Sequence, residues 1–338
     1  MRKLLYNTSI KTIEVLKTHI FKFFIVSESL FLEKLIANRI YLCNFALAFT
    51  KISTRNMKLI ADSGSTKTDW CMTSGKDIVA RVNTQGINPF HQDKNVIEKV
   101  IRTELLPSIG VPVEVVDAVY FYGAGCVDAV IPAMTETLQY IFQSAKIVEV
   151  HSDLVAAARS LFGQENGIAC ILGTGSNSCL YKNGKITANI PPLGYILGDE
   201  GSGAALGRLF FNGIFKGGLP EEIRDLYMKE TGYTYSNIIN KVYREPLANR
   251  FLASVSAFIN AHKNEYPQLQ ELVINNFRAF FQNNIARYNN VRLKVGAVGS
   301  IAYYYKKELC KAAELEGYEF SDIEKAPMGG LLSYHSEL

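Results

Sequence analysis

Apolar runs that end in glycine and hydroxyl residues are the most regular pattern along the chain. The runs at 57–61 and 168–172 are each followed within two residues by a polar turn, Ser63-Gly64-Ser65-Thr66 and Gly173-Thr174-Gly175-Ser176. A short apolar run bounded by turn residues predicts a buried strand. The two turns lie about 110 residues apart, which is far enough for each to belong to its own domain.

The pattern after the first turn predicts a hairpin-led sheet followed by alternating helices and strands. Further strands are expected at 69–72, 77–82, 113–122 and 146–150, and helices at 95–109, 129–142 and 154–162. Polar residues follow several of these strands. Ligands bind at the carboxyl ends of strands in open α/β sheets, so we expect the functional residues there.

The second half begins in the same way as the first. A strand at 168–172 and a hairpin around Asn183-Gly184 are followed by a largely helical stretch at about 203–290, a strand at 291–298 and a helix at 301–313. The repeated order of strand, turn and hairpin predicts two related halves. We therefore expect two domains, 57–167 and 168–338.

The first 56 residues differ from the rest. They are apolar and basic, with nine Lys or Arg and three Glu, and charged residues interrupt both apolar runs before either can span a bilayer. They could form an amphipathic helix at a membrane surface, an extension that binds a partner, or translated upstream sequence before a native start at Met57. We favour the last, because a strand begins immediately at Met57.

Composition narrows the function classes. The chain carries a formal net charge of +4, and the +6 of residues 1–56 leaves −2 for the remainder, so charge does not favour nucleic-acid binding. The six Cys are scattered without a C-x-x-C pair, which does not favour structural zinc, an iron–sulfur cluster or a disulfide framework. Free thiols indicate a cytoplasmic protein, and we expect neither a membrane nor a nucleic-acid partner.

The two turns have the chemistry of phosphate binding. Glycine lets the backbone approach a ligand closely, and successive N–H groups form a site for anions. The first turn is not a Walker A loop, because no glycine stands at the required place before Lys67. It is not a dinucleotide-binding turn either, because it leads into a strand. The pair predicts a nucleotide held between two lobes.

Three motifs, in order, resemble one family. They are Asp62-Ser63-Gly64-Ser65-Thr66-Lys67-Thr68-Asp69, Leu172-Gly173-Thr174-Gly175-Ser176-Asn177 and Gly198-Asp199-Glu200-Gly201-Ser202. They resemble the N-acetylglucosamine kinase branch of the actin/hexokinase/Hsp70 superfamily, which is grouped with the BadF/BadG-type ATPases. The resemblance runs from about Met57 to the C-terminus. It implies two ribonuclease-H-like α/β domains with an interdomain cleft, and ATP and Mg²⁺ as cofactors.

The resemblance also implies roles for single residues. Asp62 would hold Mg²⁺ through water, and Asp153 is similar to the catalytic aspartate. The nucleotide would be bound by Gly64, Ser65, Thr66, Lys67, Gly173, Thr174, Gly175, Gly299 and Ser300. The sugar would be bound by Asn88, Asp153, Ser176, Asn177, Gly194, Tyr195 and Asp199.

Two carboxylates have an ordinary structural interpretation beside the functional one. Asp153 stands where it could be the N-cap of the helix at 154–162, a position that Asp often occupies. Asp199 and Glu200 could be an N-cap and a first-turn acid. The small residues around Asp199 favour a site where a sugar lies against the backbone. The surrounding motifs likewise favour a catalytic Asp153, which would orient the acceptor hydroxyl and accept its proton.

Three functions fit these observations. The leading hypothesis is an ATP- and Mg²⁺-dependent kinase that phosphorylates an amino sugar, with N-acetylglucosamine at its 6-hydroxyl as the first candidate. A second is a BadF-type ATPase that activates a partner enzyme through a cysteine-ligated cluster; Cys126 lies beside Gly125, but a second ligand is not evident. A third is a sugar sensor, although residues 1–56 lack a helix-turn-helix pattern. The sequence leaves the sugar and the oligomeric state open, and base rates favour a homodimer.

Overall fold

The computed structural model describes residues 57–64, 66–289 and 292–337. The expectations for residues 1–56 and the phosphate-binding role of Ser65 lie outside this part of the chain. Residues Met57–Leu338 form one compact unit. The domain boundary expected between 167 and 168 therefore stays a prediction.

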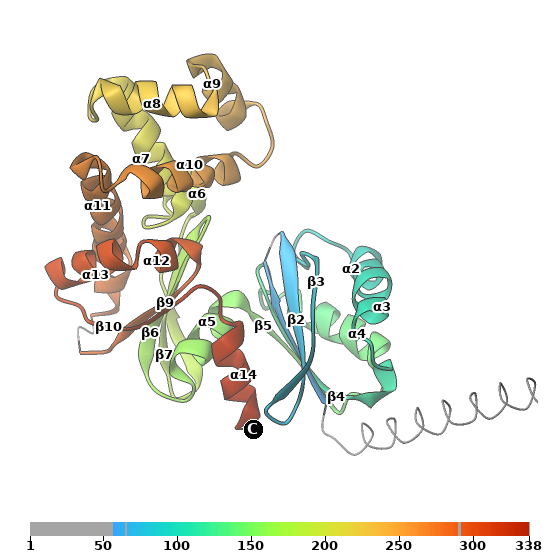
Figure 1. Ribbon diagram of the computed structural model, residues 1–338. Coiled ribbons are helices and arrows are strands. Elements are labelled where there is room, and N and C mark those ends of the chain that lie inside the picture. The colour runs from blue at the N-terminus through green and yellow to red at the C-terminus, as the bar shows by residue number, and fades with distance from the viewer. Residues whose placement is uncertain (1–56, 65, 290–291, 338) are drawn as a thin grey trace, which may run out of the picture. The chain divides into compact units, whose positions relative to one another are not determined.

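The first sheet has five strands in the order β3-β2-β1-β4-β5 (Figure 1). The strands are β1 (Met57–Ser63), β2 (Lys67–Ser74), β3 (Asp77–Gln85), β4 (Val116–Gly123) and β5 (Ile147–Ser152). Strands β1, β2 and β3 pair antiparallel, and β1, β4 and β5 pair parallel. Their parallel pairing brings the carboxyl ends of β1, β4 and β5 to one edge of the sheet.

The second sheet repeats this arrangement in the order β10-β9-β6-β7-β8. Its strands are β6 (Gly167–Leu172), β7 (Ser176–Lys182), β8 (Lys185–Asn189), β9 (Val295–Val298) and β10 (Phe320–Glu324). An antiparallel hairpin pair again stands beside a parallel pair. The turn between β7 and β8 has positive φ at both Asn183 and Gly184, which suits a tight hairpin. The repeat confirms an α/β fold of two ribonuclease-H-like halves.

Helices connect and cover the strands. In the first half they are α2 (Lys94–Val100), the π-helical turn η1 (Ile101–Leu105), α3 (Leu106–Ser108), the 3₁₀ turn η2 (Val113–Val115) and α4 (Ile131–Ile141). Figure 1 shows α2, α3 and α4 together beside the first sheet. In the second half they are α6 (Gly194–Leu197), α7 (Gly203–Lys216), α8 (Glu221–Thr231), α9 (Tyr235–Tyr243), α10 (Ala248–His262), α11 (Pro267–Asn283), η3 (Ile285–Tyr288), α12 (Ser300–Tyr304) and α13 (Lys306–Leu315).

Helix α5 (Asp153–Phe162) packs against both sheets. Ala156 joins a buried cluster with Ile60 and Tyr120 of the first sheet. On another side of the helix, Leu154 and Ala158 join a cluster with Ala169 and Cys179 of the second sheet. The small Ala side chains let the strands approach the helix closely. The first turn of α5, which begins at Asp153, is therefore held in place by contacts with both sheets.

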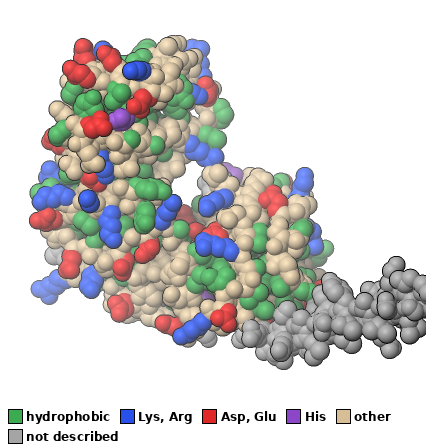
Figure 2. Space-filling model, in the orientation of Figure 1, with side chains coloured by type: hydrophobic (Ala, Val, Ile, Leu, Met, Phe, Trp, Pro, Cys, Tyr) green, Lys and Arg blue, Asp and Glu red, His purple; other side chains and the backbone are tan. Residues whose placement is uncertain are grey.

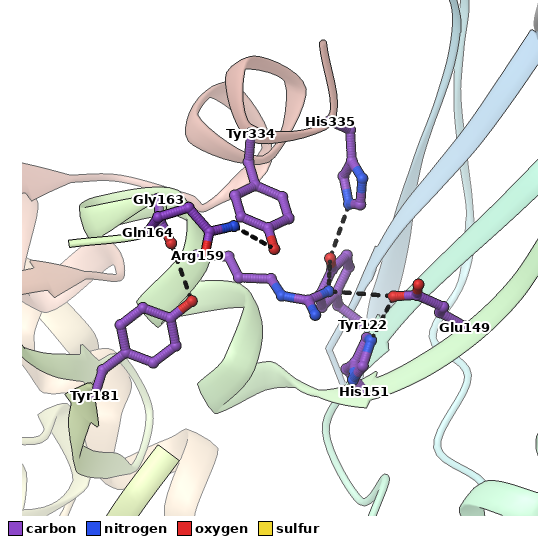
Figure 3. A network of polar contacts seen from close by, with 9 residues as sticks. All are labelled: Tyr122, Glu149, His151, Arg159, Gly163, Gln164, Tyr181, Tyr334 and His335. Atoms are coloured by element: carbon purple, nitrogen blue, oxygen red, sulfur yellow. Dashed lines mark hydrogen bonds and ion pairs between the residues drawn. The ribbon is translucent and has the colours of Figure 1, made fainter. Parts of the chain in front are cut away.

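The C-terminal helix α14 (Met328–Ser336) returns to the first sheet. Met328 and Leu331 are buried against the strands of that sheet. Tyr122 of β4 hydrogen-bonds His335 of α14 through its hydroxyl and Nε2, at 2.8 Å. Figure 3 shows this contact within a network that also includes Arg159 of α5, whose Nη1 donates to the Tyr122 hydroxyl at 2.7 Å.

Some elements differ from those expected. Residues 113–115 form a 3₁₀ turn after Pro112, so strand β4 starts at Val116. The late strand β9 covers only Val295–Val298. The helix expected at 301–313 is divided at Tyr305 into α12 and α13. The Tyr305 hydroxyl donates to the Ser256 carbonyl oxygen. Strand β10 and helix α14 lie beyond the last element expected from the sequence pattern.

On the face shown in Figure 2, Lys and Arg side chains are interspersed with Asp and Glu rather than gathered in one patch. Within the described ranges, no helix has both the length and the apolar character that crossing a membrane requires.

Candidate active site

The first glycine turn links β1 to β2. The backbone N–H of Gly64 donates to the Lys67 carbonyl oxygen at 3.0 Å, which closes a tight loop. Gly64, Thr66 and Lys67 are exposed, so their polar groups are open to a ligand. The turn therefore has the exposure that phosphate binding requires, while Ser65 lies outside the described residues.

Asp62 lies at the end of β1, directly opposite Asp69 on β2. Burial and the negative charges of Asp69 and Asp153 raise the pKa of Asp62 to about 7, although Lys67 opposes the shift. Asp69 forms an ion pair with Arg81, whose Nε donates to its Oδ1 at 3.0 Å. Asp62 has no such ion pair among the described residues, so a cation beside it would be stabilised.

Asp153 is the first residue of helix α5 and is not its N-cap. Ser152 has the extended backbone of a cap, and its Oγ accepts from the Val155 N–H at 3.4 Å. The structural interpretation of Asp153 as the N-cap is therefore wrong, because the serine before it fills that position. Burial raises the pKa of Asp153, while the N–H groups of Leu154 and Asp153 lower it. The carboxylate is thus left for another function.

Asn88 follows the buried residue Ile87 in the loop after β3. Its Oδ1 accepts from the Phe90 N–H at 3.0 Å. This bond uses one lone pair of the oxygen and leaves the side-chain NH₂ group available to a ligand. Gly125 packs against Asn88 so closely that a Cβ there would lie 2.1 Å from Asn88 Oδ1. Gly125 also has φ +78, so both the close contact and the backbone conformation favour glycine at this position.

The second glycine turn is bound to the start of helix α7. The carbonyl oxygens of Gly173 and Thr174 accept from the N–H groups of Gly203 and Ala204, at 2.9 and 3.1 Å. In a trans peptide the N–H points opposite to the preceding C=O. The N–H groups of Thr174 and Gly175 therefore point away from α7. Two adjacent donors facing the same way are suited to bind a phosphate.

Asp199 lies against this second turn. Its backbone is left-handed, with φ 55, and its side chain accepts from the Ser176 N–H. A Cβ on Gly175 would come within 3.0 Å of Asp199 Oδ2. Helix α7 is capped instead by Ser202, whose Oγ accepts from the Ala205 N–H at 3.0 Å. The interpretation of Asp199 as a helix cap is therefore wrong as well.

The residues around Asp199 occupy different environments. Ser176 is buried, whereas Asn177 is half-buried and its Oδ1 accepts from Asn189 Nδ2 at 2.9 Å. Gly194 begins the short helix α6 and is exposed. Tyr195 is half-buried and packs against the core of the second half. The segment that carries Gly194 and Tyr195 is hydrogen-bonded to Asp199, because the Asp199 N–H donates to the Pro192 carbonyl oxygen at 2.9 Å.

Asn276 holds the Asp199 loop and was missed in the sequence. This buried side chain on α11 accepts from the Gly201 N–H at 3.1 Å and donates to the Ser202 carbonyl oxygen at 3.2 Å. The signal that could have identified it is an Asn on the apolar face of a helix, between Val273 and Phe277. A buried amide needs partners, and here those partners belong to the candidate site.

Gly299 brings a third turn next to the second. It follows β9 with φ +123, and a Cβ there would lie 2.3 Å from the Leu172 carbonyl oxygen. Its N–H donates to the Glu324 carbonyl oxygen at 3.0 Å. Ser300, which is exposed, begins helix α12. Only glycine fits where β6 and the 299–300 turn meet.

The candidate residues thus form two groups. Asp62, Asn88, Asp153 and the first turn gather at the carboxyl edge of the first sheet. The second turn, Asp199 and the 299–300 turn gather at the corresponding edge of the second sheet. No hydrogen bond or ion pair between described residues joins the two groups directly, and helix α5 contacts both sheets.

Cys126 is a poor candidate for a cluster ligand. Its thiol is buried, and burial together with the charge of Asp153 raises its pKa to about 12. A ligand cysteine must be a thiolate. Across the described ranges, no group of three or more His, Cys, Asp or Glu is placed to bind a metal.

The chain resembles two solved structures described as "Putative N-acetylglucosamine Kinase". One, from Porphyromonas gingivalis, has 47% sequence identity and a TM-score of 0.80, over 83% of this chain and 99% of the other. The other, from Chromobacterium violaceum, has 16% identity and a TM-score of 0.63 over the same shares, and shows the fold alone. No family model and no curated protein matches the chain. At 47% identity over most of its length, the chain belongs to the N-acetylglucosamine kinase family of the actin/hexokinase/Hsp70 superfamily.

Proposed function

We propose that this protein is a sugar kinase that uses ATP and Mg²⁺ to phosphorylate an amino sugar, with N-acetylglucosamine as the substrate and its 6-hydroxyl as the acceptor. The observation that carries the proposal is the position of Asp153. This carboxylate begins a helix that another residue already caps, beside Asp62 and at the carboxyl edge of the first sheet. A general base must be able to reach the acceptor hydroxyl, and Asp153 is not engaged as the helix cap.

The two glycine turns would bind the phosphates. Gly64, Thr66 and Lys67 are exposed on the first turn, and Ser65 belongs to the same proposed set. The N–H groups of Thr174 and Gly175 would serve from the second turn, and Gly299 and Ser300 would contact the adenosine. Positioning and charge neutralisation are the main requirements of phosphoryl transfer, and these groups supply both.

The site around Asp62 fits a magnesium ion. Mg²⁺ keeps several waters and is held by one or two carboxylates together with substrate phosphates. Asp62 offers one carboxylate in a region where Asp69 and Asp153 add negative charge. When bound, the ion would neutralise charge on the phosphates. Asp62 would hold it through water.

The reaction needs one proton acceptor. The sugar hydroxyl oxygen forms a bond to the γ-phosphorus, the bond from that phosphorus to the β–γ bridging oxygen breaks, and ADP leaves. The hydroxyl proton passes to the Asp153 carboxylate. Because burial raises the pKa of Asp153, this carboxylate is a stronger base than an exposed one.

The sugar would be oriented by polar groups from both halves. Asn88 offers its side-chain NH₂ group, and its Oδ1 accepts from the Phe90 N–H. Asp199, Ser176 and Asn177 would bind hydroxyls from the second half, next to Gly194 and Tyr195. We infer two domains, 57–167 and 168–338, whose closure over the substrates would exclude water from the γ-phosphate.

The test is ADP release by the purified protein over a panel of sugars. We expect N-acetylglucosamine to be the best substrate among N-acetylmannosamine, glucosamine, N-acetylmuramic acid and glucose, and phosphorus NMR to place the phosphate on O6. A folded protein that is inactive on the whole panel would contradict the proposal. A BadF-type activator would instead show iron absorbance after anaerobic purification, which the buried, protonated Cys126 argues against.

A further inference from the structure

Two buried hydroxyls join the first glycine turn to the loop that carries Asn88. Ser63 and Thr68 face each other across the β1–β2 hairpin, and their hydroxyl oxygens are 2.6 Å apart. They are 1% and 0% exposed. The turn between them is exposed at Gly64, Thr66 and Lys67, whereas the two hydroxyls at its ends are shielded from water.

Both hydroxyls bind the backbone of Ile87, the residue before Asn88. The Ile87 N–H donates to Ser63 Oγ at 3.0 Å and to Thr68 Oγ1 at 3.2 Å. Ser63 Oγ in turn donates to the Ile87 carbonyl oxygen at 2.8 Å. Ser63 thus satisfies both polar groups of a fully buried residue.

The two hydroxyls share two hydrogens among three contacts. Ser63 gives its hydrogen to the Ile87 carbonyl oxygen, and Thr68 gives its hydrogen either to Ser63 Oγ or to the Gln85 carbonyl oxygen, which is 3.2 Å away. A further backbone bond runs beside this pair, from the Gly86 N–H to the Thr66 carbonyl oxygen at 3.1 Å. The loop is therefore attached to the hairpin at successive residues.

We infer that Ser63 and Thr68 are positioning residues that hold the Asn88 loop in register with the phosphate-binding turn, so that the sugar is placed relative to the nucleotide. The inference rests on the proposed function. Removing either hydroxyl leaves a buried N–H or C=O of Ile87 with fewer partners, and the loop can shift. The hairpin itself keeps its β-ladder, so the turn stays in place.

The experiment compares Ser63→Ala and Thr68→Val with the wild type in steady-state kinetics. We expect the KM for the sugar to rise about 10- to 100-fold, because small misplacements of a binding group have effects of this size. The KM for ATP should change much less. Thr68→Ser keeps the hydroxyl and should restore the sugar KM. Thr137→Val removes a buried hydroxyl that donates to the Ala133 carbonyl oxygen on α4, and is the matched control.

A double-mutant cycle decides whether Ser63 acts through Asn88. If it does, Ser63→Ala should add little to the sugar KM of an Asn88→Ala variant. Effects that multiply, or an unchanged sugar KM in both hydroxyl variants, would overturn the inference. If Ser63→Ala does not fold, the Thr68→Val and Thr68→Ser pair decides by the same readout. A wild-type protein inactive on every sugar overturns the proposed function, and this inference with it.

Discussion

Ser152 Oγ accepts from the Val155 N–H, and this bond leaves the neighbouring Asp153 free of the capping role at the start of helix α5. The two adjacent residues have separate tasks. One stabilises the helix, and the other presents a carboxylate at the edge of the first sheet. Substitutions at the two positions should therefore have different consequences.

Asp153→Asn should lower kcat at least about 100-fold, because a general base contributes a factor of this order. The nucleotide-binding turns are untouched, so ATP affinity should be retained. Unfolding should occur at the same temperature or a higher one, because the buried charge is removed. Thermal melts and kinetics measure both effects. Ser152→Ala, in contrast, should lower stability by about 1 kcal/mol through the lost cap. Near-normal turnover in Asp153→Asn would contradict the assigned base.

The pH dependence of kcat should report the same carboxylate. Burial raises the pKa of Asp153 above the ordinary range, and the base works only when deprotonated. Activity should therefore fall as the pH decreases through that raised pKa. Rates at saturating sugar and ATP give the profile. His151→Asn should leave the acid limb in place, and a limb that disappears with His151 would assign it to the imidazole instead.

The parts of the site that the sequence predicts are local. An apolar run followed by Gly, Ser and Thr indicates a strand and its turn, and both glycine turns lie where expected. The helix predicted at 154–162 begins one residue earlier, at Asp153. Its cap could not be chosen from the sequence, because Ser152 and Asp153 are both good caps and only the hydrogen bond to Val155 distinguishes them.

The parts that sequence reasoning missed depend on contacts between distant segments. Asn276 binds the loop at Gly201 from a helix far along the chain. Helix α14 returns to the first sheet after the second is complete, and no local pattern indicates where a terminal helix packs. The contact of Ser63 with Ile87 likewise depends on how the hairpin meets the next loop.

Two adjacent glycines test the packing of α14 on α5. A Cβ at Gly330 would lie 2.1 Å from the Ser160 carbonyl oxygen, whereas Gly329 has no neighbour within 4 Å. Gly330→Ala should lower the free energy of unfolding by about 1–3 kcal/mol through overpacking. Gly329→Ala should be neutral or stabilising by up to about 1 kcal/mol, because alanine favours the helix. Denaturant titrations compare the two, and equal effects would contradict the close approach of the helices.

The buried His335 should make stability depend on pH. It is 1% exposed, and burial, with a smaller effect of Arg159, lowers its pKa to about 3. Arg159 donates to the Tyr122 hydroxyl, so that hydroxyl can donate to His335 Nε2, and a neutral imidazole accepts the bond (Figure 3). Folding therefore favours the neutral ring.

The unfolded chain binds a proton at His335 near pH 6.5, while the folded chain does not until about pH 3. Between these values the unfolded state holds more protons, so stability is lost as the pH falls and is fully present above pH 7. At pH 5 this loss is about 2 kcal/mol. His335→Gln keeps a polar side chain but cannot titrate. Urea unfolding at pH 8, 6.5 and 5 measures the free energy of unfolding of both proteins. The difference between the wild type and this variant should fall by that amount from pH 8 to pH 5. A difference that stays constant with pH would mean that His335 is not held neutral by the fold.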